Sequence, residues 1–362
     1  MSASAQQSDI AHAVELTQAG KLHEAELVWR KLSQAHSGNP SVHLGLGIVL
    51  SQEGNLPEAA AEYRKALALN PHLPDASFNL GLAEFKQGHF AEAVPALTTA
   101  AKENPKEDRS GLLLGMSYFG LHDYGKAVPF LQTAVHSQPE NLELHSVLAQ
   151  SCLRSSQYPC AMAEYKAILT TNPDSVQAHM LLGQALDGMG RSADAIAELE
   201  TGARIAPSEP DVHFELGYLY FTKHDYERAA PQFELEIKNN PADAQSYTYL
   251  GDIKRRNNDN AASETLLNKA LQLEPNIRLA YFDLGSIYAS HNQNQKALEA
   301  FLKAEELDPR EPDAHYRLAR LYTAMGDKNK ADLEFSKTKE LHNRAAELLV
   351  QKVNGTIAVT PQ

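Results

Sequence analysis

The chain of 362 residues has only two cysteines and one tryptophan, and no apolar run approaches the roughly 20 residues of a membrane span. It has no glycine-rich phosphate loop, no His-Glu-x-x-His pair, no paired-cysteine zinc spacing and no nucleophile elbow. Acidic residues outnumber basic ones, 46 to 33, which disfavours binding to a phosphate backbone. We therefore predict no catalytic site, no metal, no cofactor, no nucleic-acid partner and no membrane insertion.

What the sequence does contain is a repeat of 34 residues, without insertion or deletion, that covers the chain from residue 6 to about residue 345. A fixed period of this length predicts a solenoid, in which each unit buries its apolar face against its neighbours. Positions 1 to 34 of the unit are called columns below. The ten repeats begin at Gln6, Pro40, Pro74, Asp108, Leu142, Val176, Pro210, Ala244, Arg278 and Pro312.

The columns predict a helical hairpin in each repeat. Column 8 is Gly or Ala throughout, and column 20 is Ala in every repeat but one, where Ser263 replaces it, so two helices can approach closely there. Column 15 holds Gly, Asn, Ser or His, which suit the turn between them. Column 24 is bulky, as at Tyr63, and we expect it to fill the space between adjacent repeats. Proline closes eight repeats and ends the second helix.

These columns resemble the tetratricopeptide repeat family, whose motif is Leu-Gly, an aromatic three residues on, Ala, a bulky residue, Ala and Pro. The resemblance implies an all-α fold, a right-handed superhelical solenoid of ten helix-turn-helix repeats with a C-terminal capping helix. It also implies a non-catalytic, bacterial-type multi-repeat scaffold that binds proteins or peptides. The aromatic of the motif, at column 11, is present in four repeats, as Tyr118, Tyr220, Tyr288 and Tyr322.

The repeats divide the chain into residues 1–5 as a disordered tail, 6–345 as ten units, 346–352 as a capping helix and 353–362 as a flexible tail. Asn343 replaces the final proline, so the last helix is expected to continue or restart into the cap. The small-x-small residues of 3–5 fit either a short tail or the remnant of a removed export signal. We expect a soluble protein, cytoplasmic by default, with export to a periplasm as the alternative.

The two cysteines, Cys152 and Cys160, lie on opposite sides of the inter-helix turn in the fifth repeat. This placement could bring their Cα atoms within the roughly 4.4–6.8 Å that a disulfide requires. The alternative is a pair of buried thiols in a reducing compartment. A disulfide and export would be expected together.

Five of the fifteen histidines share column 4. A metal would need their nitrogens about 2.0–2.1 Å from one ion, whereas packed helices lie roughly 8–10 Å apart. Other repeats carry Tyr247 and Tyr281 in the same column, so we predict a half-buried ring at a packing site. The five are His43, His145, His179, His213 and His315.

The family resemblance implies that columns 2, 5, 6, 9, 12 and 13 of the first helices face a ligand in a concave groove. Other columns already supply the core, so aromatic and charged residues here are surplus to packing and favour binding; the alternative is burial between neighbouring repeats. The predicted groove residues are Phe78, Leu82, Phe85, Leu112, Met116, Phe119, Phe214, Tyr218, Phe221, Asp252, Arg255, Phe282, Tyr316, Arg317 and Arg320.

The sequence thus predicts a scaffold that binds a protein or peptide segment of unknown identity. Column 5 has no Lys and column 9 no Asn, so the carboxylate clamp found in chaperone-binding members of the family is absent. Two alternatives remain: a structural spacer or self-assembling rod, and a regulatory adaptor of a separately encoded enzyme. The oligomeric state is left open.

Overall fold

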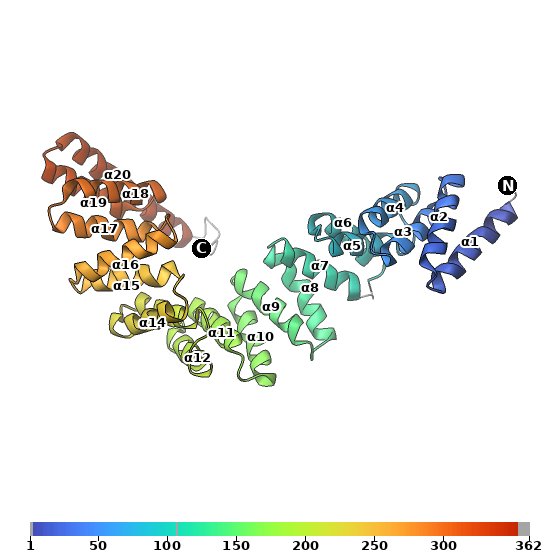
Figure 1. Ribbon diagram of the computed structural model, residues 1–362, viewed down its shortest axis with the longest axis horizontal. Helices are drawn as coiled ribbons and strands as arrows, with labels where there is room; N and C mark the ends of the chain where they lie inside the picture. The colour runs from blue at the N-terminus through green and yellow to red at the C-terminus, as the bar shows by residue number, and fades with distance from the viewer. Residues whose placement is uncertain (1–2, 106–107, 354–362) are drawn as a thin grey trace. The chain divides into compact units, whose positions relative to one another are not determined.

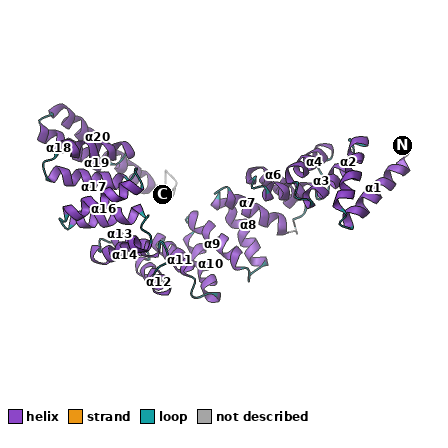
Figure 2. Ribbon diagram, in the orientation of Figure 1, coloured by secondary structure: helices purple, strands orange, loops and turns teal. Residues whose placement is uncertain are grey.

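The computed structural model describes residues 3–105 and 108–353, and these contain twenty α-helices and no strand (Figures 1 and 2). The prediction of an all-α array of helical hairpins is confirmed. The chain forms two compact units, Met1–Thr171 and Asn172–Gln362. Within the described ranges, none of the helices is both long enough and apolar enough to cross a bilayer.

The first unit holds five hairpins, each made of an odd-numbered first helix and an even-numbered second helix. Its first helix begins at Ala3, so residues 3–5, expected in a tail, are helical, and residues 1–2 lie outside the described part. The helices are α1 (Ala3–Gln18), α2 (Leu22–Ala35), α3 (Pro40–Gln52), α4 (Leu56–Leu69), α5 (Ala76–Lys86), α6 (Phe90–Glu103), α7 (Asp108–Gly120), α8 (Tyr124–Ser137), α9 (Leu142–Arg154) and α10 (Tyr158–Thr171).

The second unit repeats this arrangement and ends in one long helix. The second helix of the last repeat and the expected cap at 346–352 form one helix that ends at Val353, the first residue of the predicted tail. Residues 354–362 of that tail lie outside the described part. The helices are α11 (Val176–Gly188), α12 (Ser192–Ile205), α13 (Val212–Thr222), α14 (Tyr226–Asn239), α15 (Ala244–Arg256), α16 (Asn260–Leu273), α17 (Arg278–Ser290), α18 (Asn294–Leu307), α19 (Pro312–Met325) and α20 (Lys328–Val353).

Column 15 turns the chain from the first helix to the second. All ten of its residues have positive φ, including Ser156 at 58° and Gly190 at 73°. The next amide then bonds back to the carbonyl of column 11, as from Asn55 to Leu50 at 2.9 Å, which satisfies a carbonyl at the helix end. The predicted turn is confirmed in every repeat.

The glycines of column 8 allow the bulky side chain of column 24 to lie directly on the first helix of the same repeat. A Cβ added to Gly47 would come within 2.6 Å of the Tyr63 ring, and one added to Gly285 within 2.6 Å of Phe301. We had expected column 24 to fill the space between repeats. The contact that requires glycine instead lies inside the hairpin, because column 24 is one turn beyond the small residue of column 20.

Columns 11 and 19 close the turn end of each hairpin, and in every repeat but the third and the eighth their residues change together. All four column-11 tyrosines lie beneath a Lys or Arg at column 19, with the cation 4.5–5.7 Å from the ring centroid. Where column 19 is Glu24, Glu58 or Asp194, column 11 is leucine. The motif aromatic therefore belongs to a cation–π pair.

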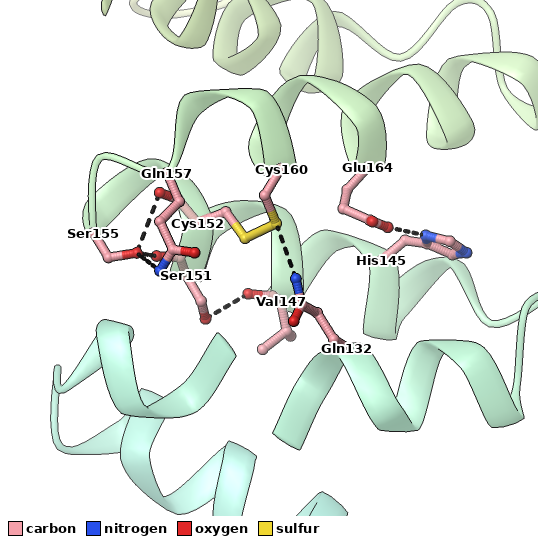
Figure 3. Close-up of a disulfide and its surroundings, with 9 residues drawn as sticks. All are labelled: Gln132, His145, Val147, Ser151, Cys152, Ser155, Gln157, Cys160 and Glu164. Carbon is pink, nitrogen blue, oxygen red and sulfur yellow. Dashed lines mark hydrogen bonds and ion pairs between the residues drawn. A yellow bond between two sulfur atoms is a disulfide. The ribbon is translucent and has the colours of Figure 1, made fainter. Parts of the chain in front are cut away.

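The fifth repeat replaces this pair by the two cysteines. Cys152 on α9 and Cys160 on α10 are joined in a disulfide, with their Cα atoms 5.8 Å apart (Figure 3). Cys152 is fully buried, and Gln132 of α8 approaches the Cys160 sulfur at 4.0 Å. The disulfide thus joins the two helices at the same columns where other repeats use a ring and a cation.

We predict that Ser156→Gly stabilises the protein by about 0.5–1 kcal/mol, because glycine adopts positive φ without the steric cost that serine incurs. The matched control, Gly190→Ala, should destabilise by a similar or larger amount. Urea unfolding of the three proteins measures both effects. A loss of stability in Ser156→Gly would contradict this account of the turn.

Candidate functional site: the groove columns of the first helices

A groove of about 430 Å³ opens on the first two repeats, in the first unit. It is lined by apolar side chains that include Ile10, Leu44 and Ile48, with a neutral polar rim. Apart from Trp29, its lining residues all lie in the columns that the family resemblance assigned to ligand contact. The complete lining is Ile10, Val14, Thr17, Gln18, Trp29, Ser41, Leu44, Gly45, Ile48 and Gln52.

Trp29 forms the floor of this groove. A Cβ on Gly45 would meet the Trp29 ring at 2.5 Å, so only glycine leaves room for it. The indole N–H donates to the Thr17 hydroxyl at 3.1 Å, which fixes the ring. Sequence reasoning missed this groove because its residues are ordinary aliphatics, although their columns, 5, 9 and 13, were the available signal.

The predicted patch of repeats three and four is half-buried. The six residues Phe78, Leu82, Phe85, Leu112, Met116 and Phe119 come from α5 and α7, and each retains partial exposure. Their aromatic rings already contact other residues: Arg109 stacks over Phe78 at 4.7 Å, and Phe85 lies 5.5 Å from Phe90. Packing therefore uses part of this surface, and it remains a predicted binding patch.

The aromatic cluster of repeats seven and eight is more exposed, with Tyr218 at 40% of its full accessibility. Phe214, Tyr218 and Phe221 on α13 all surround Tyr249 on α15, at centroid distances of 6.1, 5.4 and 5.0 Å. Burial raises the pKa of Tyr249 to about 12, with Tyr218 and Asp252 contributing. Tyr249 occupies column 6 and was missing from the predicted set.

A buried carboxylate fixes the start of α13 beneath this cluster. Glu236 on α14 is fully buried and accepts hydrogen bonds from the backbone N–H groups of Asp211, at 3.0 Å, and Phe214, at 3.2 Å. Burial raises its pKa, and the two backbone bonds oppose that rise. Glu236 therefore positions the residue from which the aromatic cluster begins.

Asp252 and Arg255, both predicted groove residues, belong to an ion cluster inside the protein. Arg255 bridges Asp252, at 2.6 Å, and the fully buried Asp283 of α17, at 2.7 Å. Arg256 pairs with the other oxygen of Asp252 at 2.7 Å. Burial, with the neighbouring Asp252 carboxylate, raises the pKa of Asp283. Arg255 thus neutralises the carboxylates of Asp252 and Asp283, although its column was predicted to face a ligand.

The predicted groove residues of repeats nine and ten differ in how accessible they are to a ligand. Phe282 lies between Arg278 and Arg317, each 5.8 Å from its centroid. Tyr316 is 43% exposed, and Arg320 is exposed without an ion pair or hydrogen bond among the described residues. Of the predicted arginines, Arg320 is therefore the one without an ion pair, hydrogen bond or ring contact among the described residues.

The column-4 histidines are buried and fully hydrogen-bonded. In each, Nδ1 faces a Glu or Gln oxygen of column 23 at 2.5–2.7 Å, and Nε2 faces a backbone carbonyl six residues earlier at 2.9–3.1 Å. Figure 3 shows one such pair, His145 with Glu164. Both ring nitrogens of each histidine therefore have a polar partner within hydrogen-bond distance.

This pairing fits the predicted packing role, because both ring nitrogens of each histidine have protein partners. Around His315 the carboxylates of Glu305 and Glu334 also gather, and Lys337 lies 3.2 Å from the first and 2.9 Å from the second. Lys337 therefore supplies a cation to that cluster. Sequence comparison within the chain could have revealed the pairs, because a Glu or Gln occupies column 23 only in the five repeats with a column-4 histidine.

Comparison with known families confirms the class of fold. Models described as TPR repeat or tetratricopeptide repeat match residues 49–88, 84–151, 118–184, 180–245, 214–276, 285–326 and 312–341. The matches cover most of the array, and the chain belongs to the tetratricopeptide repeat family, a family of protein-interaction scaffolds.

No curated protein matches the chain, but solved structures resemble it. A chain in the crystal structure of the APC/C hetero-tetramer Cut9–Hcn1 is 17% identical, over 83% of this chain and 59% of that one, with a TM-score of 0.50. Yeast Tom70 is 15% identical over 99% and 98%, with a TM-score of 0.45. MamA from Desulfovibrio magneticus RS-1 is 24% identical over 47% and 96%, with a TM-score of 0.42. At these identities the likeness concerns the fold alone.

We predict that Glu164→Ala destabilises the fifth repeat by about 3 kcal/mol, because it leaves the buried His145 ring without its carboxylate. The double variant His145→Tyr/Glu164→Ala copies Tyr281 and Ala300 of the ninth repeat and should cost less than about 1 kcal/mol. Urea unfolding combined with amide exchange in α9 and α10 measures the difference. Equal losses in the two variants would show that the pair is not coupled.

Two arginines on the groove columns should behave differently. Arg255→Met leaves two buried carboxylates with one partner and should destabilise by about 3–5 kcal/mol. Arg320→Ala removes an exposed charge and should change stability by less than about 0.5 kcal/mol. Thermal unfolding of both variants tests the assignment; a large loss in Arg320→Ala would refute it.

Proposed function

We propose that this chain is a non-catalytic scaffold that binds a segment of a partner protein on the groove columns of its first helices. The observation that carries the proposal is the aromatic cluster of Phe214, Tyr218 and Tyr249, in which Tyr218 is 40% exposed and the other two rings are partly exposed. These rings come from two successive repeats and pack against one another, so they form a continuous apolar surface. Solvent-exposed apolar surfaces of this kind are characteristic of partner binding.

The partner would bring an apolar side chain to this cluster and an acidic group to the C-terminal repeats. Tyr218 and Tyr249 combine ring surface with a hydroxyl, which suits a peptide that is partly apolar and partly polar. Arg320 supplies an unpaired charge for an acidic residue. The first-unit groove over Trp29 is neutral and apolar, so it fits an aliphatic side chain. An amphipathic helix or an extended strand can present such anchors.

The disulfide bears on the cellular compartment in which the scaffold would act. Disulfides persist in oxidising compartments, and the cysteines Cys152 and Cys160 are the only two in the chain. We therefore propose that the scaffold works outside the reducing cytoplasm, as the export alternative in the sequence analysis suggested.

A self-assembling rod is the second candidate, and one observation favours it. The last helix, α20, leaves Phe335 39% exposed, although it occupies column 24, whose residues are buried in the nine preceding repeats. The same helix exposes Leu333 at 56%, Leu348 at 44% and Val350 at 57%. A second copy of the chain that covered Phe335 would extend the array.

We predict that Phe214→Ala/Tyr218→Ala weakens partner binding at least about thirtyfold, because even one aromatic anchor of this kind contributes about 2 kcal/mol or more. The matched control is Leu235→Ala/Leu302→Ala, which removes two exposed apolar side chains from second helices. Affinity capture with mass spectrometry identifies the partner, and titration of that partner gives the affinities. Circular dichroism confirms that each variant is folded.

Two outcomes would contradict the groove proposal. One is capture of the same partners, with the same affinity, by the wild type and the Phe214/Tyr218 variant. The other is loss of binding in the Leu235/Leu302 control alone. Light scattering that rises with protein concentration, without partner capture, would favour the rod.

A further inference from the structure

Columns 4 and 23 together fill the gap between one second helix and the next. Five repeats fill it with the histidine pair, and repeats eight and nine fill it with Tyr247 and Tyr281. Repeat four has glycine at column 4 but Phe130 at column 23. Among repeats two to ten, only the third has small residues in both columns, Ser77 and Ala96.

The structure has a cavity at this position. A cavity of about 560 Å³ lies between α4, α5 and α6 of the first unit, and both Ser77 and Ala96 line it. Leu67 of α4 and Leu80 of α5 add apolar walls. The cavity therefore coincides with the columns that a ring and its partner fill in other repeats, and it is separate from the groove columns.

The cavity keeps the acceptor that a histidine uses elsewhere. In the five paired repeats, Nε2 donates to the carbonyl six residues before column 4, as His43 does to Ser37 at 3.0 Å. The corresponding carbonyl in the third repeat belongs to Pro71, which lines the cavity. Among the described residues, no hydrogen bond reaches the Pro71 carbonyl. An acceptor for one ring nitrogen is thus present and unused.

The charge of the cavity favours a cation. Glu92 lines it one helical turn before Ala96, on the same face of α6, and has no ion pair or hydrogen bond within the described ranges. Glu84 also lines it, buried, and pairs with Arg64 and His89. His72 also lines the cavity and lies 3.8 Å from Glu103, which can balance its charge. The Glu92 carboxylate is the lining charge without a partner among the described residues, so a positively charged N–H donor complements the site better than a neutral one.

We propose that this cavity binds the imidazole side chain of a histidine presented by a partner protein. The ring lies between Leu67 and Leu80, donates one N–H to the Pro71 carbonyl and turns the other toward Glu92. The precedent for this binding mode is in the chain itself, because an imidazole ring fills the equivalent space in five other repeats. The site lies among α4, α5 and α6, so it acts independently of the groove proposed above.

The test uses N-acetyl-histidine amide as the probe and N-acetyl-alanine amide as its control, at pH 6, where a free imidazole is largely protonated. Methyl NMR of the full chain follows Leu67, Leu80 and Ala96. We expect saturable shifts with a Kd on the order of 1–10 mM for the histidine probe, the range expected for so small a ligand, and none for the alanine probe.

The closing variant is Ser77→His/Ala96→Glu, which rebuilds the pair that five repeats already accommodate. It should abolish the shifts at Leu67 and Leu80 while thermal stability stays the same or rises. If this variant does not fold, Ala96→Phe closes the cavity with the residue that repeat four uses at column 23. Shifts that persist unchanged in a folded, closed variant would overturn the proposal.

The opening variant is His145→Ser/Glu164→Ala, which creates the same vacancy in the fifth repeat, where the disulfide holds the hairpin together. It should gain a second set of saturable shifts, from α9 and α10, weaker than the first because Cys160 stands at the column where Glu92 supplies a carboxylate. Binding there without binding at the third repeat would overturn the proposal, as would equal shifts from the alanine probe.

Discussion

The structure depends on the close approach of two helices within each repeat, where the bulky side chain of column 24 lies on the small residue of column 8. At Gly47 and Gly285, an added Cβ would come within 2.6 Å of a ring carbon. Such an approach forces the neighbour to move, so column 8 is restricted to Gly and, in three repeats, Ala. Because this contact recurs at a fixed period, every other column keeps a constant environment from repeat to repeat.

That constancy explains why residues change in pairs. A Tyr at column 11 comes with a Lys or Arg at column 19, whereas the fifth repeat uses a disulfide at the same two positions. A histidine at column 4 comes with a Glu or Gln at column 23. Different chemistries serve the same packing position. A column pair that lacks its usual partners, such as Ser77 and Ala96, therefore marks a place where something outside the chain can bind.

The sequence predicted those features that depend on one residue and its local backbone. The turn at column 15 is an example, since a left-handed φ is a local requirement that Gly, Asn, Ser and His reveal. The proline breaks and the small residues of column 8 follow from similarly local rules. Hence the repeats, the helices and their order could all be predicted before the structure was known.

The features that could not be predicted depend on contacts with residues in another helix or another repeat. Arg255 occupies a groove column, but the carboxylate that it neutralises belongs to Asp283 in the next repeat. The histidine partners lie 19 residues away across the hairpin. Tyr249 and the groove over Trp29 were overlooked because single aromatic or aliphatic residues carry no signal apart from their column. The face of a helix can be read from a sequence, whereas the neighbours on that face require coordinates.

The central claim is that partners contact the first helices, at the aromatic cluster around Tyr249, while the second helices carry the packing. Site-specific photo-crosslinking tests it most directly, with a photoreactive phenylalanine placed at Tyr218 in one protein and at Leu235 in another. Both positions are exposed, at 40% and 39%. We predict that the probe at Tyr218 crosslinks a partner polypeptide and the probe at Leu235 does not. Crosslinking from Leu235 alone would contradict the account.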